Sequence, residues 1–505
     1  MTAVALLRKN APVLDPVWRR VFLRCLLLPV AVTAPLLYLA ADADHRYNVY
    51  WHGSIGQQRP WRLVTDNLRS VPMYLGFGNF RPLGRMLEWS VDTVAYVFGE
   101  VTHLPVQVGL RLVSALAAAV LCAAAVLFAE AVTAPGRMFA EPPARPIALL
   151  PFAFAAGLCA AGRLSTTVLF GGLYFLSAAL VLAVAAWVCG SPRWGALVVL
   201  AGATLAVFNE VAALAPPLAT AAVLARGGPA RLRPALLLWG GFLPVFGPVR
   251  VLLYQACRDG GCYGNSDLTL GPGVGGALTN RLTAWLPPLQ WGEAMRDAGP
   301  PSKVVFGVAA VVLALLAVRA FAEVPRLPGL DRPRAVRLAV AGGSVLLLGA
   351  VLGSINPQTQ ELAEAGRWGL GWRDSGLTAA GGALLLAGLL ALAGRAVVTR
   401  VALVVFVLLG AGTTTVNQAY AVGGDRLPYA VLTGAIAAEV AQFDSRPSGN
   451  TRRCALLDEF GATLRAAPYS RFASGELPGT HSAAQRMAVT ASMATEQMYG
   501  RPFCR

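Results

Sequence analysis

Two carboxylates, Asp42 and Asp44, follow an apolar segment that ends near Ala40, in the sequence ADADHRYNVYWHG. A carboxylate at the boundary between lipid and water loses part of its hydration, and its pKa rises toward the range useful for a general base. We therefore predict that this pair accepts a proton from a bound hydroxyl. Asp44 is the first choice, because it lies further from the apolar segment and adjoins His45. The structural alternative is that both acids only mark the end of a membrane span.

A third carboxylate, Glu210, lies in the short polar sequence FNE within the long apolar stretch 194–225. Acidic side chains at membrane depth are costly and are candidates for functional sites. We predict that Glu210 joins Asp44 in one catalytic site. The alternative is an acid at the external end of a short span that forms only local hydrogen bonds.

Aromatic and imidazole side chains follow the acidic pair at once. We predict that His45, Tyr47, Tyr50 and Trp51 contact a sugar or acceptor; the alternative for the aromatic rings is a belt at the membrane interface. The three histidines of this segment match no metal-binding spacing, so no metal cofactor is expected, although a divalent ion remains an alternative. Phosphate-binding glycine loops, nucleophile elbows and HExxH helices are absent from the sequence, which argues against nucleotide-driven transport and common hydrolase mechanisms.

The composition indicates which elements must position these residues. The chain has 505 residues, of which 56% are hydrophobic and 13% charged, and its mean hydropathy is +0.57. Soluble domains have roughly 25% charged residues, so we predict an all-α polytopic membrane protein. The net charge of +16 comes from short basic clusters between apolar runs, which is the positive-inside pattern and not a nucleic-acid-binding stripe. The positive charge is almost entirely arginine, which, with the abundant alanine and glycine, suggests a bacterial plasma membrane.

The apolar runs predict about 11 transmembrane helices, with the N-terminus in the cytoplasm and the C-terminus outside. The expected spans cover about 21–41, 107–133, 146–161, 167–189, two short spans within 194–225, 235–254, 303–318, 338–354, 376–394 and 401–420. Residues 1–421 would form the membrane domain and 422–505 a small external domain with helices at 454–467 and 481–499. The long external loop 42–106 contains a helical pattern at 83–99, which predicts either an interfacial helix or an ordinary packed one.

The cysteines fit this topology. Four of them, Cys25, Cys122, Cys159 and Cys189, lie in apolar runs and are expected to be small core residues. The other four lie on the predicted outer side, where disulfides persist. Pairing nearest neighbours gives Cys257–Cys262 and Cys454–Cys504, but four cysteines allow three connectivities.

The order of these features resembles the GT-C superfamily of integral-membrane glycosyltransferases. In that family a first span precedes a long external loop that opens with acidic residues, and an interfacial helix and many further spans follow. Here ADADH corresponds to the acidic opening, 83–99 to the interfacial helix and 422–505 to the outer domain; RPLGR at 81–85 is similar to loop sequences of such enzymes. The acidic pair is DxD and not two adjacent acids.

The resemblance implies transfer of a sugar from a polyprenyl-phosphate donor to a glycan or other cell-envelope acceptor on the outer face of the membrane. Asp44, or else Asp42, would be the base, and arginines would bind the phosphate of the donor, because a guanidinium group matches phosphate geometry. The arginines on the predicted outer side are Arg81, Arg85, Arg163, Arg367, Arg373 and Arg426. Each of them taken alone is equally compatible with a solvated or lipid-headgroup contact.

Two other classes of function stay open at this stage. A transporter or flippase of a lipid-linked or polar substrate would place polar residues at mid-membrane in several spans. Here they concentrate in the outer loops, which favours the enzyme. A non-catalytic scaffold of an envelope assembly would tolerate loss of Asp44 and Glu210. The sequence predicts membrane lipid as a partner, excludes no oligomeric state, and specifies neither the sugar nor the linkage.

Overall fold

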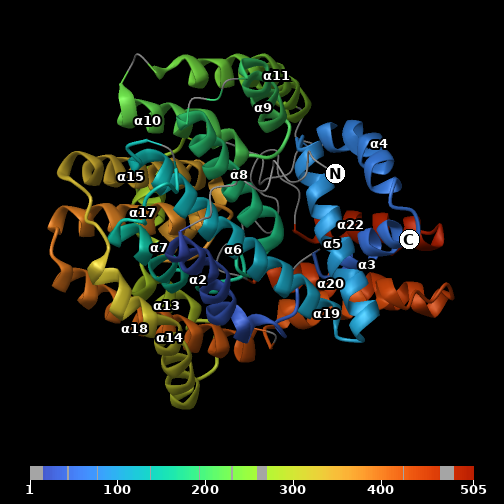
Figure 1. Cartoon of the computed structure of the whole chain (residues 1–505). Helices are drawn as coiled ribbons and strands as arrows, with labels where there is room; N and C mark the ends of the chain where they lie inside the picture. The colour runs from blue at the N-terminus through green and yellow to red at the C-terminus, as the bar shows by residue number, and fades with distance from the viewer. Residues whose placement is uncertain are drawn as a thin grey trace, which may run out of the picture.

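The computed structural model describes residues 15–505 except 43–44, 77, 137, 191, 193, 229–230, 259–269, 425 and 467–482. All regular secondary structure in this part of the chain is helical, as the sequence predicts (Figure 1). Most helices form one bundle, and the helices of the first loop and of the C-terminal tail lie together beside it (Figure 1).

Seven helices among the described residues are long and apolar enough to cross a membrane. The protein is therefore a multi-pass membrane protein. These helices are α6 (Val106–Thr133), α8 (Gly171–Cys189), α11 (Arg233–Cys257), α14 (Lys303–Glu323), α15 (Arg332–Ser354), α17 (Ser375–Ala393) and α18 (Ala396–Gly424).

The other four expected spans correspond to shorter or more polar helices: α2 (Pro16–Thr33), α7 (Arg145–Ala156), α9 (Gly195–Ala206) and α10 (Ala215–Gly227). The continuous span expected over 146–161 is wrong in length, because α7 has 12 residues. Such a helix is about 18 Å long, whereas the hydrocarbon core is about 30 Å thick. The expected break near Glu210 is confirmed, since α9 ends at Ala206 and the short helix η2 (Ala212–Leu214) precedes α10. The count of eleven complete spans stays a prediction.

Small residues allow the membrane helices to pack closely. At the contact between α15 and α17, a Cβ atom on Gly381 would lie 2.4 Å from the backbone nitrogen of Leu346, and one on Gly388 equally close to that of Ala339. Glycine lets the two backbones approach, which is how helices associate in lipid without a hydrophobic driving force. The main hydrophobic core continues through α2, α6, α7 and α8.

Segments that the sequence assigns to the cytoplasmic side contact one another. Arg20 and Arg24 of α2 both pair with Glu323 at the end of α14, at 2.8 and 3.2 Å. Arg145 at the start of α7 donates from Nε to the carbonyl oxygen of Leu327 at 2.8 Å. These basic turns therefore meet at one place, although their sidedness stays a prediction.

The first long loop contains three helices, α3 (His45–Gln58), α4 (Arg62–Gly76) and α5 (Pro82–Thr102). Only the third was expected, from the pattern at 83–99, and it is confirmed as a helix. The first is rich in polar residues and lacks a clear apolar periodicity, whereas the second has apolar residues at helical spacing that the sequence analysis did not use. Shorter helices occupy the later loops: α12 (Val274–Thr283), α13 (Pro287–Ala294) and α16 (Pro357–Glu364).

The tail folds into α19 (Pro428–Ala441), α20 (Pro447–Arg465) and α22 (Ala483–Tyr499), so the expected tail helices are present. Its core is shared with the first loop. Tyr47 and Trp51 of α3 are buried in one hydrophobic cluster with Ile436, Phe460 and Phe503 of the tail. The tail is therefore anchored on α3 and does not build its core alone.

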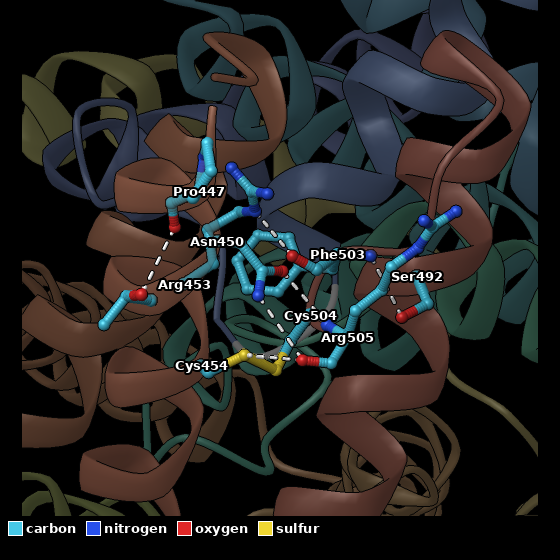
Figure 2. The surroundings of a disulfide bond; sticks show 9 residues. Pro447, Asn450, Arg453, Cys454, Ser492, Phe503, Cys504 and Arg505 are labelled. Carbon is cyan, nitrogen blue, oxygen red and sulfur yellow. Dashed lines mark hydrogen bonds between the residues drawn. A yellow bond between two sulfur atoms is a disulfide. The ribbon is translucent and has the colours of Figure 1, made fainter. Parts of the chain in front are cut away.

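The expected disulfide between Cys454 and Cys504 is confirmed and joins the start of α20 to the end of the chain (Figure 2). Hydrogen bonds hold the same segment: Arg453 Nε donates to the carbonyl oxygen of Phe503 at 2.5 Å, and the amide of Phe503 donates to Ser492 Oγ at 3.2 Å (Figure 2). The four apolar-run cysteines are free and buried, as expected. Cys262 lies outside the described residues, so its pairing with Cys257 stays a prediction.

Replacing Cys454 by serine is expected to lower the stability of the tail by about 4 kcal/mol, because the bond closes a 50-residue loop and limits the unfolded chain. Limited proteolysis of the tail in increasing denaturant measures this loss. Cys504→Ser should give the same shift, and the double variant no more than either single one. If the two single variants lose different amounts of stability, the serine substitutions themselves, and not the loss of the cross-link, cause the change.

Candidate functional site

A buried arginine fixes the end of the first span against a neighbouring turn. Arg111 of α6 donates to the carbonyl oxygens of Leu39 at 2.9 Å and Ala40 at 2.6 Å, and to that of Val168 at 2.5 Å. A guanidinium group in this position satisfies several backbone acceptors that follow a helix end. The segment that leads to Asp42 is thereby held beside the turn at 162–168.

Further hydrogen bonds extend this assembly to two distant segments. The hydroxyl of Thr166 donates to the carbonyl oxygen of Trp372 at 3.1 Å, which places the turn beside the loop before α17. Arg373 in that loop pairs with Glu210, at 2.7 Å between Nη1 and Oε1. The segments that the sequence assigns to the outer side therefore contact one another. The Arg373–Glu210 pair joins residues that are 163 positions apart in the chain.

The start of α5 docks directly on the break before Glu210. The backbone amides of Leu83 and Gly84 donate to the carbonyl oxygens of Val207 and Phe208, at 3.2 and 3.0 Å. A Cβ atom at position 84 would lie 2.3 Å from the Phe208 oxygen, so only glycine allows this approach. The sequence RPLGR is thus placed against FNE by backbone contacts.

This docking produces a cluster of charged residues from four segments, which we call the Glu210 cluster: Arg81, Glu88, Tyr174, Glu210 and Arg373. The hydroxyl of Tyr174 lies 3.4 Å from Glu210 Oε1 and accepts from Arg81 Nη1 at 3.2 Å. Arg81 also pairs with Glu88 at 3.4 Å. Arg81 is therefore held by two acceptors, Tyr174 and Glu88, and Arg373 by Glu210.

The electrostatics of the cluster keep Glu210 ionised. Burial by itself would raise the pKa of Glu210, but Arg373 and Arg81 outweigh it and hold that pKa at about 2. The pKa of Arg373 is raised, because Tyr174 and Glu210 outweigh the effect of burial. Both partners are thus charged at neutral pH.

The pH dependence of this ion pair is a direct test. Since the pKa of Glu210 is depressed to about 2, its contribution to stability is full above the unfolded value of about 4.3 and is lost as the pH falls through 2. The stability difference between the protein and Glu210→Gln should therefore be constant from pH 5 to 8 and shrink below about pH 4. Thermal unfolding in detergent at several pH values measures it. A difference that already changes between pH 6 and 7 would contradict the assignment.

Additional positive charge lies around this cluster. The guanidinium of Arg85 stacks on the ring of Tyr74, 3.0 Å from the centroid, and Arg85 and Arg81 line one small polar pocket between α4 and α5. Arg250 of α11 also interacts electrostatically with Glu210. Arg85 and Arg250 therefore add positive charge beside a cluster whose own two arginines and two carboxylates balance.

The remaining predicted phosphate ligands lie elsewhere. Arg367 pairs with the buried Glu293, at 2.5 Å between Nε and Oε1. Arg163 stacks on the ring of Tyr429 at 4.6 Å, and Arg426 is exposed. Of the six arginines predicted, two belong to the Glu210 cluster and a third, Arg85, adjoins it.

The structure describes only one of the two predicted bases, Asp42. Asp42 is half-buried and interacts electrostatically with Tyr420 of α18. Asp44 lies outside the described residues, so its role and its proximity to Glu210 stay predictions. Among the sugar-contact candidates, Tyr47 and Trp51 are buried in the core shared with the tail, and Tyr50 packs edge-on against Tyr96. These three side chains therefore have packing roles that do not require a ligand.

A buried cluster that the sequence did not indicate includes His45, the first residue of α3. Asp92 of α5 receives hydrogen bonds from His45 Nε2 at 2.9 Å and His52 Nδ1 at 2.6 Å, and all three residues are buried. The imidazoles stack on Phe170 and Trp89, with centroids 4.4 and 4.5 Å apart. Burial alone would raise the pKa of Asp92, but His45 and His52 lower it, so the carboxylate is ionised.

The spacing of charged residues on α5 was the available signal for this cluster. Arg85, Glu88 and Asp92 recur at helical intervals and therefore share one face. On a surface helix that face would point to water, but here all three are buried. The sequence pattern shows the shared face and not the direction in which it points.

A second buried pair fixes Asp374, the residue that follows Arg373 in the chain. Arg281 of α12 binds the carboxylate of Asp374 with two hydrogen bonds, at 3.0 and 2.6 Å. Both side chains are buried, so the pair is fixed in a bidentate geometry next to Arg373. Neither residue was predicted, because Arg281 lies in a polar loop with no local pattern.

Among the described residues no group of three or more His, Cys, Asp or Glu side chains is arranged to hold a metal ion. Comparisons with models of protein families, with curated proteins and with solved structures found no match to this chain.

Proposed function

We propose that this protein is a membrane glycosyltransferase that moves a sugar from a polyprenyl-phosphate donor to a cell-envelope acceptor on the outer face of a bacterial plasma membrane. The observation that supports it best is the Glu210 cluster together with the further arginines beside it, Arg85 and Arg250. Arg81 and Arg373 converge there from segments far apart in the chain. A lipid phosphate that leaves during transfer requires such preorganised positive charge at the membrane surface.

The arginines of the cluster have distinct surroundings. Arg373 is held by Glu210, and Asp374, the next residue in the chain, is fixed by Arg281. Arg81 is shared between Tyr174 and Glu88 and lines the pocket with Arg85. In the proposed reaction these groups bind the donor phosphate and stabilise the charge that develops on it.

Glu210 acts as a positioning residue in this proposal. A general base is most effective when its pKa lies near the operating pH, whereas the pKa of Glu210 is about 2. The proton of the acceptor hydroxyl would therefore pass to Asp44, or else to Asp42. The segment before these acids is fixed by Arg111, which gives the loop a defined starting point.

The membrane topology that we infer from the basic turns decides which side of the membrane the site faces. The N-terminus would be cytoplasmic, the C-terminus external, and the Glu210 cluster would face the outer side, where polyprenyl-linked donors are used.

Transfer by the protein in lipid nanodiscs, from a short-chain polyprenyl-phosphate sugar, tests the proposal. Arg373→Gln should reduce transfer by about 100-fold or more, as loss of a preorganised charged donor does. Since this change leaves Glu210 without its partner, the double variant Glu210→Gln/Arg373→Gln keeps the cluster neutral and should fold while remaining inactive. Arg452→Gln, which changes an exposed arginine of the tail outside the six predicted phosphate ligands, is the matched control.

Equal transfer by Arg373→Gln and Arg452→Gln would contradict the proposal. A flippase is distinguished in the same preparation, because it would move the lipid-linked sugar across a vesicle membrane without forming a glycosylated product.

A further inference from the structure

Helix α4 has its polar side toward the protein and its apolar side outward. Trp61, just before the helix, is 64% exposed, Val64 and Leu68 are 42 and 57% exposed, and Val71 and Leu75 are half-buried. These residues recur at helical spacing and form one continuous stripe, which we call the α4 apolar face. A helix on the surface of a soluble domain would turn this face toward the core.

The opposite side of α4 is polar and anchored. Asn67 is fully buried and donates from Nδ2 to the carbonyl oxygen of Pro82 at 3.1 Å. Ser70 and Tyr74 line the polar pocket together with Arg81 and Arg85. Because these contacts hold the polar side inward, α4 cannot rotate to bury its apolar face without losing them. The described part of the chain therefore leaves that face uncovered.

The α4 apolar face continues a surface that belongs to a candidate membrane span. α4 packs against α11, which lies beside it at the edge of the bundle (Figure 1). Leu243, Val251 and Leu252 of α11 are 53, 56 and 48% exposed. A helix that crosses the bilayer exposes such residues to acyl chains. The α4 apolar face lies beside these residues of α11 and would contact the same acyl chains.

The charges of α4 fit the edge of a bilayer. Arg69 is 82% exposed in its side chain and sits one position after Leu68. Arg62 is paired with Asp66 at 2.8 Å. A long arginine side chain beside an apolar stripe reaches the headgroups while its neighbours lie among acyl chains.

We propose that α4 lies in the membrane interface, with its apolar face covered by lipid of the bilayer that the bundle spans. This assigns an interfacial role to Arg62–Gly76, whereas the interfacial role predicted for the pattern at 83–99 stays a prediction. The occupant is lipid, and the inference does not depend on the sugar-transfer reaction.

A single environment-sensitive fluorophore on a cysteine at position 64 tests the proposal in the full-length protein in nanodiscs. The native free cysteines among the described residues are buried, which limits labelling elsewhere. Val489→Cys on α22 is the matched control, because Val489 is 40% and Val64 42% exposed. The label at 64 should emit at shorter wavelength, be quenched by a lipid-attached nitroxide and be shielded from iodide. The label at 489 should show the reverse.

Two outcomes would overturn the proposal. Equal access of iodide to both labels would place α4 in water. Shielding of position 64 from both quenchers would show that a protein, either a partner or a second copy of this chain, covers the face. Leu68→Cys, labelled in the same way, provides a second position on the stripe, and unchanged thermal unfolding of each labelled variant shows that the fold is retained.

Discussion

Asp44→Asn is expected to reduce sugar transfer by at least 100-fold, because general-base catalysis contributes about 10²–10⁴-fold. Asparagine keeps the size of the side chain and removes its basicity, so insertion and folding should be unaffected. Initial rates with a polyprenyl-phosphate sugar in nanodiscs measure the loss, and thermal unfolding shows that the fold is retained.

Asp42→Asn is the control for position along the loop. It should retain most of the activity, since Asp42 lies at the end of the segment that Arg111 fixes to the bundle. If Asp42→Asn abolishes transfer and Asp44→Asn does not, the base is Asp42. If both variants stay active, the enzyme proposal based on this loop is wrong.

Asp92→Ala is expected to lower the free energy of unfolding by about 3–5 kcal/mol, the range for breaking a buried charged interaction. The change leaves His45 and His52, both buried, without the acceptor they share. It also removes two of the hydrogen bonds that join α3 to α5. Thermal or denaturant unfolding of the purified protein, followed by tryptophan fluorescence, measures the effect.

Asp92→Asn separates hydrogen bonding from charge. Its amide oxygen accepts from one imidazole and its amide nitrogen donates to the other in a changed tautomer, so the cost should be smaller, about 1–3 kcal/mol. Arg452→Gln is the surface control, because it removes the exposed pair between Arg452 and Glu439 and should cost at most about 1 kcal/mol. Similar shifts for Asp92→Ala and Arg452→Gln would contradict a structural role of the histidine–aspartate cluster.

The sequence by itself determined the features that depend on local patterns. Apolar runs predict membrane helices because each span must satisfy its backbone hydrogen bonds internally, whatever its neighbours are. The interruption FNE and the prolines after it predict the break between α9 and α10 for the same reason. The cysteine count on one side of the predicted membrane limited the pairings, and nearest-neighbour pairing gave Cys454–Cys504 correctly.

Only the tertiary structure decided which charges meet. Arg373 and Glu210 are 163 residues apart, and their contact depends on the packing of α5 against the break before Glu210. The same packing turns Asp92 inward toward His45 and His52, and the inverted orientation of α4 follows from its hydrogen bond to Pro82. A helical repeat shows which residues share a face. The direction of that face depends on contacts between segments far apart in the chain, which no local pattern contains.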